Sequence, residues 1–264
     1  MKLVNLFLVF LLNSIFSFAQ DLQLINTIDI QEPTEVSLDR GGNIYYAAFN
    51  GDIIKYDPFL KTELTFSPSN PNTTTILEAW QGLRVFSFHK DLQQFRLINR
   101  NLSLHEDYSF LQEIVSFVEI ATPSYDNNIW LFDQVDFSLK KYDITTNQLW
   151  STTPLNQILN PNNYEILFCK EYQNRLFIST RGRGILIFDN FGNYIKTFDY
   201  KGITFFNFWK DIMYFLVDNK LIKIDLYDEN NISLVIPNHA DWLFALLFED
   251  RVYLFSKNQI NLYK

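Results

Sequence analysis

The sequence of 264 residues contains very few of the residues that build common reactive sites: one Cys, three His and eight Gly. A single cysteine, Cys169, excludes an internal disulfide framework, and its apolar, strand-like surroundings predict a buried thiol. The three histidines, His89, His105 and His239, have no metal-ligand spacing and are predicted to be solvent-side loop residues. Phosphate loops, GxSxG elbows, HExxH motifs and EF-hands are absent as well. We therefore expect no catalytic residue and no cofactor.

Basic residues are also scarce. The 22 Lys and Arg face 30 Asp and Glu, for a net charge of -8. Such an acidic chain is a poor partner for nucleic acid or for anionic lipid, because both repel it. After the first 20 residues, no apolar run approaches the ~20 residues of a membrane span, so we expect no membrane insertion.

The N-terminus has the pattern of an export signal. Lys2 supplies a positive charge, an apolar run covers Leu3 to Leu12, and the small residues Ser17 and Ala19 stand where a signal peptidase needs them. The sequence thus predicts a signal peptide over residues 1–19, a mature domain over residues 20–264, and a periplasmic or extracellular location.

Aromatic residues are abundant, at 17% of the chain, and they recur at a regular interval. The stretch RLFISTRGRGILIFDNFGNYIKTFDY, residues 175–200, reads as three strands joined by two tight turns. When the other apolar runs are aligned on its Phe177, the matching positions are all aromatic: Tyr45, Phe86, Trp130, Tyr214 and Tyr253. A period of ~40–45 residues with four short strands is typical of propeller blades, so we predict an all-β, closed six-bladed β-propeller.

A second fixed position follows each aromatic one by 10 to 12 residues. In four of the six units the next residue is an aspartate: Asp57, Asp143, Asp189 and Asp225. Aspartate often accepts backbone N–H bonds at the start of a turn, so we interpret these residues as turn formers. In the turn Arg181 to Gly184, Gly182 or Gly184 is expected to have a positive φ.

The last unit has only three predicted strands, the final one over Gln259–Tyr263. A strand-like segment, Leu22 to Ile30, is left over at the other end of the chain. We therefore predict that it pairs with the final strand, with a bulge near Asn26, and closes the ring without an open edge.

Three boundaries are less regular. The outer strand of blade 2 is predicted around Leu102–Leu104, and the inner strand of blade 3 over Glu113–Ala121. Tyr108 to Phe117 fits a helical turn or a strand about equally. The inner strand of blade 5 is predicted over Ile203–Trp209.

Blade 4, LFISTRGRGILIFDNFGNYIKTF, resembles the propeller repeats of extracytoplasmic sensors of bacterial two-component systems. Blade 1, DRGGNIYYAAFNGDIIKYD, looks like the NHL-type repeat. Similar repeats occur in Bacteroidota cell-envelope and secretion-system proteins of the PorZ type. The resemblance implies a propeller fold and an envelope setting, and it implies little about function because the motif is a strand–turn signature.

The candidate binding residues come from turns and strand ends. We expect the inserts 67–74 and 152–163 to share one face of the ring with Arg181, Arg183 and His89, and to contact a partner there. Trp80 and Trp209 end inner strands and are further candidates, because Trp is common in interaction hot spots.

The predicted function is a non-catalytic scaffold that presents loops to a protein partner of the cell envelope, such as an outer-membrane or secretion complex. Carbohydrate binding and sensing are variants of this interpretation. The alternative is a metal-dependent lactonase or esterase that uses acidic residues of the inner strands. These residues are Glu35, Glu78, Glu119, Glu165 and Asp241, among which Glu35, Glu165 and Asp241 are the favoured ligands.

Overall fold

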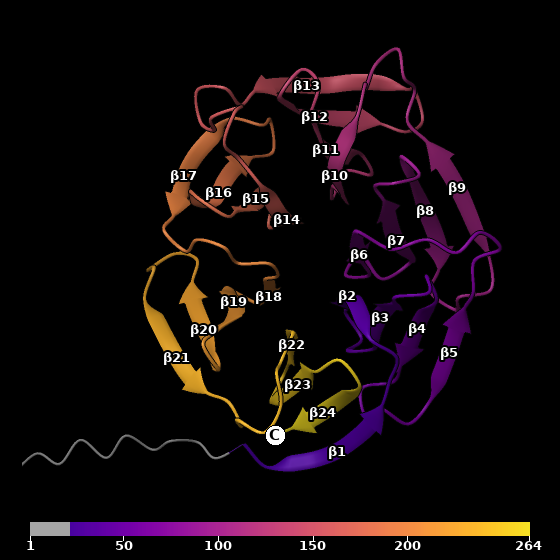
Figure 1. Ribbon diagram of the computed structural model, residues 1–264, viewed down its shortest axis with the longest axis vertical. Helices are drawn as coiled ribbons and strands as arrows, with labels where there is room; N and C mark the ends of the chain where they lie inside the picture. The colour runs from indigo at the N-terminus through magenta and orange to yellow at the C-terminus, as the bar shows by residue number, and fades with distance from the viewer. Residues whose placement is uncertain (1–21) are drawn as a thin grey trace, which may run out of the picture.

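The computed structural model describes residues 22–264, which form a ring of six antiparallel sheets with four strands each (Figure 1). The predicted six-bladed β-propeller is confirmed. The predicted signal peptide, residues 1–19, lies outside the described residues. Within residues 22–264, no helix is long and apolar enough to cross a membrane. We name the strands of each blade A to D from the central channel outward.

The first three blades follow the chain in order. Blade 1 consists of β2 (Pro33–Leu38), β3 (Ile44–Ala48), β4 (Ile53–Tyr56) and β5 (Glu63–Phe66). Blade 2 consists of β6 (Ile76–Glu78), β7 (Arg84–His89), β8 (Gln94–Asn99) and β9 (His105–Ser109). Blade 3 consists of β10 (Val118–Pro123), β11 (Ile129–Asp133), β12 (Ser138–Asp143) and β13 (Gln148–Pro154).

The remaining blades include the one that joins both chain ends. Blade 4 consists of β14 (Ile166–Tyr172), β15 (Arg175–Thr180), β16 (Gly184–Asp189) and β17 (Tyr194–Phe198). Blade 5 consists of β18 (Asn207–Trp209), β19 (Ile212–Val217), β20 (Lys220–Asp225) and β21 (Asn231–Val235). Blade 6 consists of β22 (Phe244–Phe248), β23 (Arg251–Phe255), β24 (Gln259–Tyr263) and β1 (Leu24–Asp29).

The two faces of the ring carry different loops. Because neighbouring strands in a blade are antiparallel, the A–B and C–D turns lie on one face, which we call the A–B face. The B–C turns and the connections from one blade to the next lie on the opposite D–A face. The position of a residue at a strand end therefore decides on which face it lies.

The repeated aromatic residues form the packing between blades. All six lie in B strands and are at most 2% exposed, from Tyr45 in β3 to Tyr253 in β23. Large side chains fill the wedge-shaped space between sheets that radiate from a common axis, which explains the aromatic content. Cys169 is buried in β14, as predicted.

The four aspartates form turns as predicted. Each accepts a hydrogen bond from the backbone N–H two residues later; Asp57 from Phe59, for example, at 2.8 Å, and Asp189 from Phe191 at 2.8 Å. The same holds for Asp143 and Asp225. These side chains begin the C–D turns of their blades.

Ring closure by the N-terminal strand is confirmed. β1 pairs with β24, from Leu24 opposite Tyr263 to Asp29 opposite Gln259, with an irregularity between Leu24 and Asn26 where a bulge was expected. Backbone bonds between Gln23 and Lys264 extend the ladder beyond the strand. In Figure 1, β1 lies outside β24 and completes the blade that holds the C-terminus.

Three predicted strand boundaries are wrong. Leu102 lies buried in the C–D turn of blade 2 with φ 55°, so the apolar residue packs below a turn and β9 begins only at His105. The segment after β9 forms one helical turn, in which Val115 N–H bonds to Leu111 C=O, and β10 starts later than predicted. In blade 5 the inner strand is short, because residues 203–206 approach it as irregular chain.

Glycine 184 tests the hairpin geometry of blade 4. Its φ is +99°, and an added Cβ would lie 2.2 Å from the carbonyl oxygen of Phe198. Gly184→Ala should therefore lower the free energy of unfolding by about 2 kcal/mol or more. Gly182 in the same turn has no atom within 4 Å of that position, so Gly182→Ala is the matched control and should be nearly neutral. Chemical denaturation measures both, and equal stabilities would contradict this hairpin geometry.

Deletion of residues 22–30 tests whether the stability of the ring depends on the pairing of β1 with β24. The deletion removes the ladder to β24 and exposes an edge, so stability should fall by on the order of several kcal/mol, with aggregation. Denaturation and light scattering measure the two effects. A truncated chain that remains monomeric with an unchanged melting temperature would show that the ring does not depend on β1.

Candidate functional site

The central channel opens on the A–B face into two adjoining cavities of about 340 Å³ and 700 Å³. The smaller one, which we call the inner lobe, lies among the A–B turns of blades 2, 3 and 4 and contacts Trp80, Tyr172 and Gln173. The larger one, which we call the blade 2–3 groove, runs outward between those two blades. Both share five residues: Arg40, Glu78, Gln81, Pro123 and Tyr125. Together they form a continuous funnel.

A buried ion pair lies at the junction of the two lobes. Lys170 on β14 reaches Glu78 on β6 at 2.5 Å, from blade 4 to blade 2 past the inner strand of blade 3. Glu78 also accepts the Trp80 N–H at 2.7 Å. A buried lysine or glutamate without a partner would cost several kcal/mol, so the two side chains stabilise each other's charged form. The pair connects the inner strands of blades 2 and 4, and its Glu78 lines both cavities of the funnel.

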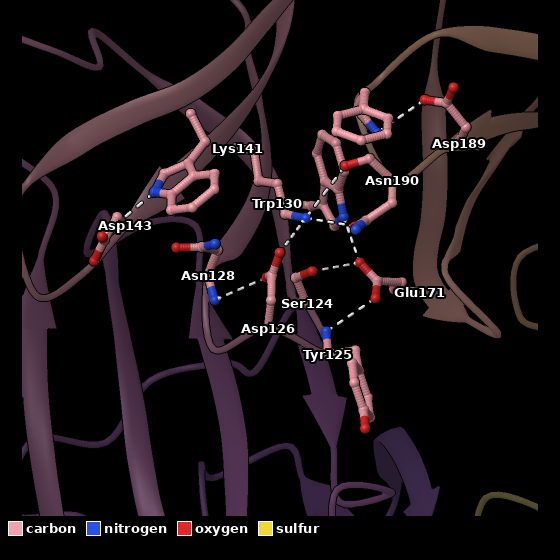
Figure 2. A network of polar contacts seen from close by, with 12 residues as sticks. Ser124, Tyr125, Asp126, Asn128, Trp130, Lys141, Asp143, Glu171, Asp189 and Asn190 are labelled. Carbon is pink, nitrogen blue, oxygen red and sulfur yellow. Dashed lines mark hydrogen bonds and ion pairs between the residues drawn. The ribbon is translucent and has the colours of Figure 1, made fainter.

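Glu171 fixes the rim of the funnel (Figure 2). Its carboxylate accepts hydrogen bonds from Trp130 Nε1 at 2.5 Å, Ser124 Oγ at 2.6 Å and the Tyr125 N–H at 2.9 Å. These bonds connect blade 4 to the A–B turn of blade 3. The Tyr125 ring extends away from the network and is 71% exposed. An exposed aromatic ring on an immobilised backbone is a suitable contact for a ligand.

A second polar contact joins the same two blades. The buried ammonium group of Lys141 binds Asp126 Oδ2 at 2.6 Å and Asn190 Oδ1 at 2.5 Å, and lies 4.9 Å from the centre of the Trp130 ring. Asp126 and Asn190 belong to turns on the A–B face (Figure 2). The two networks therefore hold this part of the face rigid.

Glu35 lies in the channel-lining strand β2. Its Oε2 atom is shielded from solvent and has no hydrogen-bond partner among the described residues. Desolvation by burial raises the pKa of the Glu35 carboxyl well above its usual range, and the positive charge of Lys170 lowers it in part. Burial, followed by the charges of Glu35 and Glu78, likewise raises the pKa of the Cys169 thiol, which is therefore no activated nucleophile.

The acidic residues suggested as metal ligands do not converge. Glu119 binds Tyr164, Glu165 is exposed and paired with Arg181, and Asp241 is exposed before β22. Among residues 22–264, no group of three or more His, Cys, Asp or Glu side chains could hold a metal ion. The favoured set of Glu35, Glu165 and Asp241 is thus not a ligand set in this fold.

The predicted binding residues separate onto the two faces. Trp80 and Trp209 end A strands and lie on the A–B face, where Trp80 lines the inner lobe. Trp209 packs against Phe248 of the next blade, with ring centres 4.9 Å apart. Arg181 and Arg183 lie in the B–C turn of blade 4, on the D–A face with the two inserts.

His89 was predicted to be a solvent-side residue, and this is wrong. It lies in β7 at 2% exposure, and its ring contacts Ser87 Oγ and the Thr73 carbonyl. Burial lowers its pKa, so it is a neutral structural group. His105 and His239 are exposed as predicted, but His105 is the first residue of strand β9 and does not lie in a loop. Arg181 forms a two-bond ion pair with Glu165, which partly neutralises the two arginines of this B–C turn.

The sequence analysis missed Arg40, Gln81 and Tyr125. They occupy A–B turns of three different blades, and only the ring brings them together. A signal was present in the repeat itself, because residues just before each B strand lie on the face where the channel opens.

No family model and no curated protein matches this sequence. Solved structures match the fold. The β-propeller domain of Cps50 (Swd1) from Myceliophteria thermophila has a TM-score of 0.63 at 10% identity, over 92% of this chain and 99% of that one. Virginiamycin B lyase from Staphylococcus aureus has a TM-score of 0.61 at 12% identity, over 92% and 99%.

A third match is the extracellular domain of a one component system protein from B. thetaiotaomicron, with a TM-score of 0.55 and 15% identity. It covers 86% of this chain and 32% of that one. At such identities the matches show the fold alone. Since one of them is named as a lyase, the fold by itself does not decide between catalysis and binding.

The raised pKa of the Glu35 carboxyl can be tested through the pH dependence of the free energy of unfolding. The folded state keeps the proton at pH values where the unfolded chain, with a pKa of about 4.3, has released it, so the stability of the native protein falls as pH rises. Glu35→Gln removes this loss. The variant should therefore gain stability relative to the native protein between pH 4 and pH 7, measured by urea denaturation.

Glu165→Gln is the control, because its effect on the pH dependence of stability should have the opposite sign to that of Glu35→Gln. The Arg181 guanidinium lowers the pKa of Glu165, so the native pair contributes stability at neutral pH that is lost on acidification. This variant should lose stability relative to the native protein as pH rises. Parallel stability curves for Glu35→Gln and the native protein would mean that Glu35 is not desolvated.

Proposed function

We propose that this chain is a non-catalytic binding propeller of the bacterial cell envelope, which docks a protein partner on its A–B face. The observation that carries the proposal is the funnel at the channel mouth, with Tyr125 exposed at its rim and held by Glu171. Binding sites are usually concave and largely preformed, and the funnel has both properties, with polar and apolar side chains both lining it.

Exposed apolar side chains on the A–B face also support the proposal that a protein partner docks there. Six large ones belong to A–B or C–D turns, each at least 49% exposed: Phe59, Leu83, Leu104, Tyr125, Phe191 and Tyr227. Aromatic residues on rigid turns lose little entropy on binding and are enriched in the centres of protein interfaces. The ring thus presents apolar contacts around a preformed cavity.

The D–A face has less support. Arg181 is paired with Glu165, and His89 is buried. The insert after β13 packs Leu155 and Leu159 into the core and is therefore not a free loop. Partner contact by Arg181 and Arg183 stays a prediction, which the experiment below also tests.

An envelope location rests on the export signal predicted from Lys2 to Ala19 and on the resemblance of blade 4 to extracytoplasmic sensor repeats. The fold match to an extracellular domain agrees with it. A hydrolase is not favoured, because Glu35, Glu165 and Asp241 do not converge and Cys169 is not activated.

Photo-cross-linking from one position on each face tests which face of the ring contacts the partner. Tyr125 on the A–B face is 71% exposed and Val135 on the D–A face of the same blade is 69% exposed. A photoreactive phenylalanine derivative at position 125, in cells of the source organism, should yield an adduct with a discrete envelope protein. The same derivative at position 135 should yield none. Adducts from position 135 alone would place the partner on the D–A face.

A further inference from the structure

The blade 2–3 groove has a chemistry of its own, distinct from the inner lobe. Resting on the proposed function, we infer that it binds an extended peptide segment of the partner, in which an acidic side chain stands next to an aliphatic or aromatic one. This assignment rests on three features of the groove: an apolar floor, two arginines at its edge and amide side chains along its walls.

The groove has an apolar floor. Phe86 and Ile129 form buried parts of it, and Leu97 and Ile144 are partly buried at its surface. Leu83 stands at the rim and is 77% exposed. Covering these groups with an apolar side chain removes apolar surface from water, which favours binding. A single large apolar side chain fits a cavity of this size.

Two arginines line the groove in a protein whose net charge is -8. Arg40 makes no ion pair with any carboxylate of residues 22–264. Arg84 has Glu106 at 3.9 Å, but both side chains are about 60% exposed, so solvent screens this pair. A carboxylate that enters the groove therefore finds two guanidinium groups, each able to form paired hydrogen bonds with it.

The acidic groups nearby do not cancel this charge. Glu78 is neutralised by Lys170, and Asp126 by Lys141. Glu171 lines the inner lobe, and its carboxylate is occupied by three donors. The charged residues that line the groove are thus Arg40 and Arg84 with the paired Glu78, which favours an anionic ligand and disfavours a basic one.

Amide side chains supply what an extended backbone needs. Gln81 donates to the Ser124 carbonyl at 2.9 Å, and its side-chain oxygen accepts no hydrogen bond from the described residues. Asn127 and Asn128 line the opposite wall. Amides pair with peptide N–H and C=O groups alike. A glycan is the less suitable ligand, because sugar rings need exposed aromatic faces and Tyr125 is the one such ring lining this groove.

Selection from a peptide display library on the purified mature chain tests the inference. Random peptides of about 12 residues should be enriched for Asp or Glu within two positions of Leu, Ile or Phe. A selected peptide, synthesised and labelled, should bind by fluorescence anisotropy and lose at least about tenfold in affinity on Arg40→Gln with Arg84→Gln. Arg181→Gln with Arg183→Gln is the matched control on the D–A face and should leave affinity unchanged. Replacing the acidic residue of the peptide by its amide should reproduce the loss.

The outcomes separate this inference from the proposed function. Enriched peptides that are basic, or selection without enrichment, overturn the peptide chemistry while cross-linking at position 125 still supports the A–B face. A glycan array signal that depends on Arg40 and Arg84, with no peptide enriched, assigns the groove to a sugar and also overturns it. Acidic–apolar peptides that depend on Arg181 and Arg183 overturn both.

Discussion

The ladder between β1 and β24 joins the two ends of the chain in one sheet, and the geometry of the whole ring depends on it. Six radiating sheets meet at an axis only if the last packs against the first. The aromatic side chains of the B strands fill the space between blades, but packing alone leaves the first and last blades free to separate. Closure fixes the inner strands around the channel (Figure 1). It thereby brings A–B turns of four blades to one funnel.

Charged side chains act here mainly as connections between blades. Glu78 and Lys170 join blades 2 and 4, Glu171 joins blade 4 to the turn that carries Tyr125, and Lys141 joins turns of blades 3 and 4. Each group is buried or multiply bonded, so its displacement would leave an unpaired charge at a cost of several kcal/mol. The face that carries the funnel is therefore preorganised, which reduces the entropy lost when a partner binds. Such rigidity suits a scaffold better than a device that changes shape.

The repeated aromatic positions and the aspartate turns predicted the blade count, because both recur periodically along the sequence. The closure followed from a strand count, since the last unit lacked one strand and the Leu22–Ile30 segment was left over. The boundaries of β9, β10 and β18 could not be predicted, since Leu102 and Val115 are buried in turns and resemble strand residues in their hydrophobicity. The site was predicted only in part. Trp80 lies in it, whereas Arg40 and Tyr125 have no sequence pattern and meet through ring geometry, and the burial of His89 depends on the insert that carries Thr73.

The central claim is that the A–B face of a rigid, closed propeller is its binding surface. Hydrogen exchange of the protein with and without its captured partner tests this claim most directly, because it reports every backbone amide on both faces in one measurement. The account predicts slower exchange over residues 79–84 and 124–129, which border the funnel, with no change in the inserts. Protection confined to residues 67–75 and 155–165 would place the partner on the D–A face and contradict the account.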